Sequence, residues 1–217
     1  IDLKKIDTVF LSHGHDDHTG GLKKLLEINP EIRVFAHSDV FQPKYKKVDG
    51  SLEFIGTKLD KSDISNFTAA ETTIAAAAGI YNTGEIPAPR SSYINERYVV
   101  DNEEGEKTDP FDDDTSLYIE TESGIVILLG CSHKGVKNII EEIRGAVGDK
   151  KIAAVIGGMH LKRADREEIN NLIRYFRELE LELLAPMHCT GRQASVLFKE
   201  ALGDKVQLAS VGDKFEF

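Results

Sequence analysis

The 217-residue sequence has few cysteines, no long apolar run and no excess of positive charge. Its two cysteines, Cys131 and Cys189, cannot build a disulfide framework, which suits the reducing cytosol, so we expect a cytoplasmic protein. No apolar run approaches the ~20 residues that a membrane-spanning helix needs, so we expect no membrane partner. The balance of 27 basic against 37 acidic residues gives −10, which argues against nucleic acid and leaves a small-molecule substrate as the expected partner.

The two ends of the sequence differ in what they contain. It starts at Ile1 with no initiator methionine and no visible signal peptide, so we expect further residues to precede it. The last twelve residues, "VQLASVGDKFEF", predict a pair of short strands. With 41% hydrophobic residues the chain can bury one core, and we expect a single domain over residues 1–217.

Apolar segments with strand and helix periodicity alternate along the chain. Runs over 6–11 and 32–36 predict buried strands, and leucines at helical spacing predict a helix between them. In the second half the patterns predict four strands, at 116–121, 124–130, 152–158 and 181–187. Amphipathic helices are predicted between and after them, with apolar faces that include Val136, Ile140, Ile169, Phe176, Leu197 and Phe198. This alternation predicts a layered α/β architecture.

The periodicity weakens over residues 38–114, where we expect an inserted, cap-like segment. Its alanine-rich part, "TAAETTIAAAAGI", predicts a small helix, and the lysine patch that begins at Lys44 predicts a solvated face. The stretch "NTGEIPAPRSSY" predicts part of the pocket wall, with a plain surface loop as the alternative. Three of its residues are expected to bind substrate: Thr83, Gly84 and Glu85.

Four histidines each follow the carboxyl end of a predicted strand. They are His13, His133, His160 and His188. Sites in α/β folds are built at the carboxyl ends of strands, so we expect these four side chains to share one site. His37 also follows a strand, but no other ligand-type motif surrounds it, and we expect it to support the site or to be incidental.

The first of these histidines opens the motif H-x-H-x-D-H, formed by His13, His15, Asp17 and His18. In extended backbone His13 and His15 point to the same side, while Asp17 and His18 follow in a turn that can face the other way. One loop can therefore serve two adjacent metals. Imidazole and carboxylate are ligands that zinc prefers, and they also suit iron or manganese. The sequence thus predicts two divalent metals, with zinc favoured.

The stretch "SHGHDDHTGG" resembles the signature loop of the metallo-β-lactamase superfamily. The motifs "GCSHKGVKNII", "IGGMHL" and "PMHCTGRQA", with "GIYNTGEIP" before them, are similar to the branch of dihydropterin–ribofuranosylaminobenzene phosphate synthase-like metal-dependent hydrolases. The resemblance covers nearly the whole chain and implies an αββα four-layer sandwich. It also implies N-terminal strands that this sequence does not contain. We therefore expect an N-terminally incomplete sheet, whose open edge would invite association into a homo-oligomer.

The resemblance also implies which side chains bind metal. Its ligands carry over to five positions, with His13 and His15 for the first metal and Asp17, His18 and His188 for the second. Cys131 occupies the place of an aspartate, and we expect it to be a ligand or a close neighbour. We expect His133 to be a ligand, because the place of an upstream histidine holds only aspartates 112–114. His160 has no counterpart in the general pattern, and we place it in the pocket as a substrate contact or proton donor.

Three functions are compatible with these residues. The first is a hydrolase whose dinuclear metal centre and bridging hydroxide attack a phosphoester- or carbonyl-type substrate, with Asp17 orienting the hydroxide and His160 stabilising developing charge. The second is a transferase of the same branch that joins a pterin pyrophosphate to an arylamine. The third is a non-catalytic metal-binding domain. The histidine at position 15 favours hydrolysis, because flavodiiron-type redox members carry a glutamate there.

Overall fold

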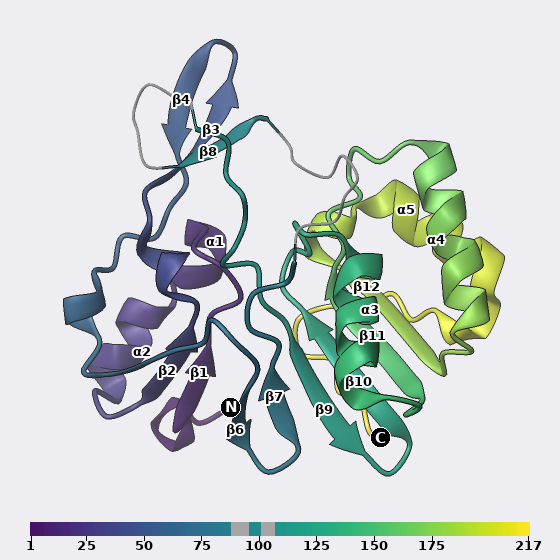
Figure 1. Ribbon diagram of the computed structural model, residues 1–217, viewed down its shortest axis with the longest axis horizontal. Coiled ribbons are helices and arrows are strands. Elements are labelled where there is room, and N and C mark those ends of the chain that lie inside the picture. The colour runs from purple at the N-terminus through teal and green to yellow at the C-terminus, as the bar shows by residue number, and fades with distance from the viewer. Residues whose placement is uncertain (88–95, 101–106) are drawn as a thin grey trace.

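The computed structural model describes residues 1–87, 96–100 and 107–217, and its strands form three sheets. Its helices are α1 (Asp16–Thr19), α2 (Leu22–Ile28), α3 (Val136–Val147), α4 (Arg166–Glu178) and α5 (Arg192–Leu202). Two of the sheets lie between the helices: α2 covers the outer side of one sheet, and α3, α4 and α5 cover the outer side of the other (Figure 1). This order of layers confirms the predicted αββα sandwich. Among the residues described, every helix is too short or too polar to cross a bilayer.

The smaller of the two layered sheets is parallel. Its strands, in the order β1-β2-β5, are β1 (Thr8–Phe10), β2 (Arg33–Ala36) and β5 (Asn66–Ala69). The predicted helix between β1 and β2 is α2, and it places Leu22 in a core with Leu11 and Val34. Parallel strands need such a crossover, because the chain must return to the starting edge of the sheet. The carboxyl end of β1 leads into the loop that contains His13 and His15.

The larger sheet has the strand order β12-β11-β10-β9-β7-β6. Its strands are β6 (Ile74–Ala77), β7 (Ile80–Asn82), β9 (Leu117–Thr121), β10 (Gly124–Leu129), β11 (Ile152–Gly158) and β12 (Leu183–Met187). β9 and β10 form the predicted antiparallel hairpin, whereas β10, β11 and β12 are parallel and are joined through α3 and α4. The carboxyl ends of these three strands therefore lie along one edge of the sheet.

The larger core lies between this sheet and its helices. Ile139 and Ile140 of α3 and Phe176 of α4 are buried against the sheet residues Ile127 and Val155. These side chains come from the apolar faces that the helical spacing predicts. A fully buried aliphatic or aromatic side chain contributes ~1.5–3 kcal/mol. Burial of this layer therefore fixes the orientation of the strand ends that carry the histidines.

The third sheet is small and antiparallel, and in Figure 1 it stands apart from the two larger sheets. Its strands, in the order β4-β3-β8, are β3 (Lys44–Val48), β4 (Ser51–Phe54) and β8 (Tyr98–Val100). The strands β5, β6 and β7 also fall within residues 38–114, yet they belong to the larger sheets. Of the described strands within residues 38–114, β3, β4 and β8 therefore lie outside the two larger sheets.

Two local predictions are wrong. The alanine-rich stretch forms the β6-β7 hairpin instead of a helix, because β7 pairs with β9, where Tyr81 lies opposite Tyr118. The expected strand pair at the end of the chain is absent from the described residues 206–217. Val206 makes a single bridge to Leu184, and most of residues 207–217 are exposed.

Candidate metal centre

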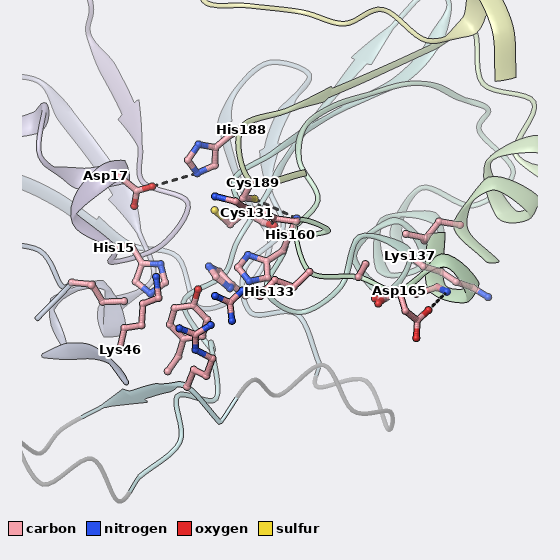
Figure 2. Close-up of a pocket in the computed structure, with 18 of the residues that line it drawn as sticks. His15, Asp17, Lys46, Cys131, His133, Lys137, His160, Asp165, His188 and Cys189 are labelled. Carbon is pink, nitrogen blue, oxygen red and sulfur yellow. Dashed lines mark hydrogen bonds and ion pairs between the residues drawn. The ribbon is translucent and has the colours of Figure 1, made fainter. Parts of the chain in front are cut away.

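Histidines from four strand ends meet between the two larger sheets. The loop after β1 supplies His13, and the ends of β10, β11 and β12 supply His133, His160 and His188. Figure 2 shows the side chains of His133, His160 and His188 turned towards the same hollow as Asp17 and Cys131. The four histidines that follow strand ends in the sequence thus lie close together in the structure.

One group of three histidines is buried. Ring nitrogens of His13, His15 and His133 lie within 4.8 Å of one another, and the Nε2 of His13 is 3.0 Å from the Nδ1 of His15. The Nε2 atoms of His15 and His133 are buried without a hydrogen-bond partner in the described structure. Buried polar atoms are rarely left in that condition, so a divalent cation among these rings fits the donor set.

A second group of possible ligands is more exposed. A carboxylate oxygen of Asp17 and ring nitrogens of His18 and His188 lie within 4.8 Å of one another. The Nε2 atoms of the two histidines are 3.1 Å apart, and the Nε2 of His188 is 3.3 Å from Oδ2 of Asp17. This mixed nitrogen and oxygen set also fits a divalent cation.

Cys131 lies where the two groups meet. Its Sγ is 3.2 Å from Nε2 of His18 and lies within 4.8 Å of a ring nitrogen of His13. The thiol therefore has one neighbour from each group. This position suits the predicted role of Cys131 as a ligand or close neighbour, and it places the thiol between the two groups.

Ser12 orients one histidine of each group. Its hydroxyl lies 3.1 Å from Nδ1 of His13 and 3.3 Å from Nδ1 of His18. Partners on Nδ1 leave the Nε2 atoms facing the other ligands, which is the usual role of the outer partners of metal-binding histidines. A Cβ on Gly130 would lie 2.4 Å from this hydroxyl. The residue that directly follows β10 must therefore be glycine for Ser12 to fit. Sequence reasoning missed Ser12, because a serine before a histidine carries no signal of its own.

A buried ion-pair network holds the loop in place. Lys44 is 1% exposed, and its Nζ donates at 2.9 Å to both Asp109 and Asp113. The backbone N–H of Gly14 donates to the second oxygen of Asp113 at 2.7 Å. The network thereby ties β3 to the backbone between His13 and His15. The prediction that Lys44 lies on a solvated face is wrong.

Aspartates 112–114 support the site without joining a ligand group in the described structure. Asp114 accepts a hydrogen bond from the backbone N–H of Lys134 at 2.9 Å, and Asp112 accepts one from the Lys134 Nζ at 2.8 Å. Burial raises the pKa of Asp114 to about 7, although the hydrogen bond from Lys134 opposes that shift. The histidine that joins His13 and His15 in the described structure is His133, which follows a different strand end.

Burial keeps the inner histidines neutral. Desolvation lowers the pKa of His13 and His133 well below the ordinary value and lowers that of His15 to about 3. It also lowers the pKa of His18, although the carboxylate of Asp17 opposes the shift. Neutral imidazole is the form that binds metal, so these rings need lose no proton near neutral pH.

The two groups open onto a cavity of about 1160 Å³. Its lining includes the site residues His15, Asp17, Cys131, His133, His160 and His188, and also Lys46, Lys162 and Tyr98. The Tyr98 ring stacks on His15 with centroids 5.5 Å apart, and the Phe111 ring stacks on His133 at 4.1 Å. Neither aromatic residue was predicted, because Tyr98 on β8 and Phe111 in the loop before β9 fall where the sequence periodicity is weak.

The three predicted substrate-binding residues lie away from this cavity. The Thr83 hydroxyl accepts a hydrogen bond from the Ser116 backbone N–H at 3.0 Å, and Gly84 donates from its backbone N–H to Asn82 at 2.7 Å. Glu85 is exposed, and none of the three lines the cavity. They form a tight turn that closes the end of β7, and Gly84 adopts a φ of 71° there. The rest of the motif, from residue 88 onwards, falls outside the described residues.

The comparisons with known proteins agree with this geometry. The family model described as the metallo-beta-lactamase superfamily matches residues 1–136. Over 236 aligned positions the chain is 33% identical to the 7,8-dihydropterin-6-methyl-4-(beta-D-ribofuranosyl)-aminobenzene-5'-phosphate synthase of Methanocaldococcus jannaschii, covering 100% of this chain and 77% of that protein.

Similar solved structures agree with this geometry as well. Tm1679, a metal-dependent hydrolase of the beta-lactamase superfamily, matches with a TM-score of 0.82 and 30% identity over 96% of this chain and 78% of its own. Igni18, a metallo hydrolase from Ignicoccus hospitalis, shares the fold, with a TM-score of 0.52 and 18% identity over 97% of this chain and 80% of its own. The relatives include a synthase and hydrolases, and the predicted resemblance is confirmed. The chain is an enzyme that belongs to the metallo-β-lactamase superfamily.

Proposed function

We propose that the enzyme is a hydrolase with a dinuclear metal centre that acts on a phosphoester- or carbonyl-type substrate. The observation that carries this proposal is the meeting of two ligand groups at Cys131, on the wall of an open cavity. When bound, a pair of divalent metals polarises the substrate and activates a water molecule as the nucleophile. Zinc is the favoured metal, and iron or manganese is the alternative, because the donors are mainly imidazole and carboxylate.

The proposed ligands of the two metals differ in how deeply they are buried. His13, His15 and His133 are fixed in the interior and would hold one metal rigidly. His188 and Asp17 have partly exposed side chains, and with His18 they would hold the second metal beside the cavity. Asp17 is therefore placed to orient a water molecule as well as to bind metal. His160 lines the same cavity, where the proposed roles are substrate contact or proton donor.

The cavity also has groups that would attract an anion. Lys46, Lys162 and Arg163 line it, in a chain whose net charge is −10. Lys46 lies on β3 and lines the cavity together with His15. Asp165 and the acidic residues next to it line the end of the cavity that lies away from Lys46 (Figure 2). A substrate with one anionic group directed at Lys46 therefore suits the cavity better than a neutral one.

A transferase is the second candidate, and one observation favours it. The relative that matches the whole chain is named as a synthase of a dihydropterin-linked aminobenzene phosphate. The Tyr98 ring in the cavity offers a stacking surface to a flat heterocycle such as a pterin. Hydrolysis and transfer would use the same metal ligands, so the site geometry is common to both candidates. The relatives favour either enzyme over a non-catalytic metal-binding domain.

Metal content separates the enzyme hypotheses from a metal-free site. We expect at least two metals per chain by emission spectrometry, and a loss of at least one metal in His13→Ala. His37→Ala is the matched control, because His37 is also a buried histidine at a strand end but belongs to no ligand group in the described structure. Near-zero metal in the wild type, or equal metal in all three proteins, would refute the dinuclear proposal.

Substrate assays then separate hydrolysis from transfer. The metal-loaded enzyme is tested on a panel of phosphodiesters and lactones and, in parallel, in a coupling assay with a pterin pyrophosphate and an arylamine. Hydrolysis that is lost in His13→Ala supports the first candidate. Coupling without hydrolysis, lost in the same variant, supports the second and refutes the first.

A further inference from the structure

Two cysteines and one histidine gather beside the dinuclear centre. Cys131 follows β10 and Cys189 follows β12, on either side of the end of β11, which leads to His160. The Sγ atoms of both cysteines and a ring nitrogen of His160 lie within 4.8 Å of one another. Figure 2 shows the two sulfur atoms next to the His160 ring. Neither of the two ligand groups described above includes Cys189 or His160. These two residues and Cys131 therefore form a separate cluster.

The backbone around the cluster is shaped to bring these donors together. His160 adopts a φ of 52° and His188 a φ of 49°, which is the left-handed region that ordinary side chains avoid. The His160 backbone N–H donates to Cys189 Sγ at 3.3 Å, which fixes the sulfur beside the ring. The Nδ1 of His160 is buried without a hydrogen-bond partner in the described structure.

The absence of a side chain at residue 158 gives the sulfur its space. A Cβ on Gly158 would lie 2.8 Å from Cys189 Sγ, 2.4 Å from the Gly130 carbonyl oxygen and 3.4 Å from Cys131 Cα. Any larger residue at this position would push the two cysteines apart. Glycine at the end of β11 therefore leaves room for the two thiols to approach each other.

We propose that Cys131, Cys189 and His160 form a third metal site, which takes a thiophilic divalent cation such as Zn²⁺. Two thiolates and one imidazole are a known zinc donor set, and they leave one coordination position for a water molecule or substrate atom. All three residues line the cavity, so that open position would face the substrate. Thiolate donors distinguish this site from the other two groups, whose donors are mainly imidazole and carboxylate.

The sharing of Cys131 has a chemical consequence. Its sulfur is within reach of both His18 and Cys189, so one thiolate would stand between the second metal and the third. Zinc binding at the third site displaces the protons of the two thiols into solvent, and no electron is transferred. His160 would then act as a ligand and would not serve as the proton donor proposed for the hydrolase.

The test measures zinc and thiols in the full chain, under a phosphine reductant that prevents disulfide formation. After loading with Zn²⁺ and removal of free metal, we expect about three zinc ions per chain in the wild type and about two in Cys189→Ser. His160→Asn is the second variant, because asparagine tolerates the left-handed backbone that His160 adopts, and we expect about two zinc ions there as well. Circular dichroism checks that each variant is folded.

Cys189 itself provides a readout that does not depend on activity. We expect zinc loading to slow its alkylation by iodoacetamide at least tenfold, and His160→Asn to restore the faster rate, because a metal-bound thiolate is a poor nucleophile. Cobalt(II) provides a second readout, since Cys189→Ser should weaken the thiolate-to-metal charge-transfer band that Cys131 and Cys189 share. Two zinc ions in wild type and Cys189→Ser alike, with equal alkylation rates in loaded and metal-free protein, would overturn the proposal. That result would leave the dinuclear hydrolase intact, since it concerns neither of the other ligand groups.

Discussion

The Nζ of Lys44 lies 2.9 Å from Oδ1 of Asp113, and both side chains are 1% exposed. The other oxygen of Asp113 accepts the Gly14 backbone N–H, so one buried ion pair ties β3 to the backbone of the metal-binding loop. The Cβ of any other residue at position 14 would lie 2.3 Å from the Val40 carbonyl oxygen. The loop between His13 and His15 is thus held on two sides before any metal binds.

Removal of Lys44 should destabilise the fold strongly. Lys44→Ala leaves Asp109 and Asp113 buried without their cation, and a broken buried ion pair costs about 3–5 kcal/mol of unfolding free energy. Urea unfolding of the metal-free protein measures this cost. Lys24→Ala is the control, because Lys24 forms an exposed pair with Glu27 and its loss should leave the midpoint unchanged. Equal midpoints for the two variants would show that the buried network does not hold the loop.

Ser12 should matter for metal binding more than for folding. Ser12→Ala removes the hydroxyl next to the Nδ1 atoms of His13 and His18, and loss of such an outer partner weakens metal affinity about 10–100-fold. Competition with a fluorescent chelator measures the affinity. Ser38→Ala is the control, because that hydroxyl bonds Glu71 at the surface. An unchanged affinity in Ser12→Ala would mean that the two rings keep their orientation without it.

Acid should destabilise the metal-free protein. The pKa of His15 is lowered from 6.5 to about 3 in the folded state, and those of His13 and His133 are also lowered by burial. Below pH 6.5 the unfolded chain therefore binds more protons than the folded chain, and the free energy of unfolding falls as the pH drops towards 3. Urea midpoints at pH 7, 6 and 5 measure this slope, and a flat profile would contradict it.

Asp114 opposes that slope and offers a check on its sign. Its pKa is raised from 3.8 to about 7, so the folded chain binds the extra proton and the stability from this group is lost as the pH rises through 7. Asp114→Asn removes this opposing contribution. Between pH 4 and 7 we expect stability of the variant to rise more steeply with pH than that of the wild type. An equal or shallower rise would mean that the pKa of Asp114 is not raised in the folded protein.

Much of the fold follows from local pattern. The β9-β10 hairpin and the helices α3, α4 and α5 have apolar spacing strong enough to be predicted, because each buries one continuous face. The β6-β7 hairpin could not be predicted, since alanine favours helices and only the pairing of β7 with β9 makes it a strand. In this hairpin, strand pairing in the folded sheet outweighs the helix propensity of the alanines.

The candidate site divides in the same way. The histidines at strand ends were predictable, because the topology of parallel strands brings those ends together. The burial of Lys44 was not, since its partners Asp109 and Asp113 lie 65 and 69 residues away in the sequence. Nor could the sequence show that His133 joins His13 and His15, which depends on how the two sheets face each other.

Anomalous diffraction at the zinc edge, from crystals of the metal-loaded enzyme, is the sharpest test of the dinuclear centre. We expect one peak bound by His13, His15 and His133 and a second bound by Asp17, His18 and His188, at ligand distances of about 2.0–2.2 Å. A peak beside Cys189 would concern the proposed thiolate site alone. The lack of a peak in either of these two groups would contradict the dinuclear centre.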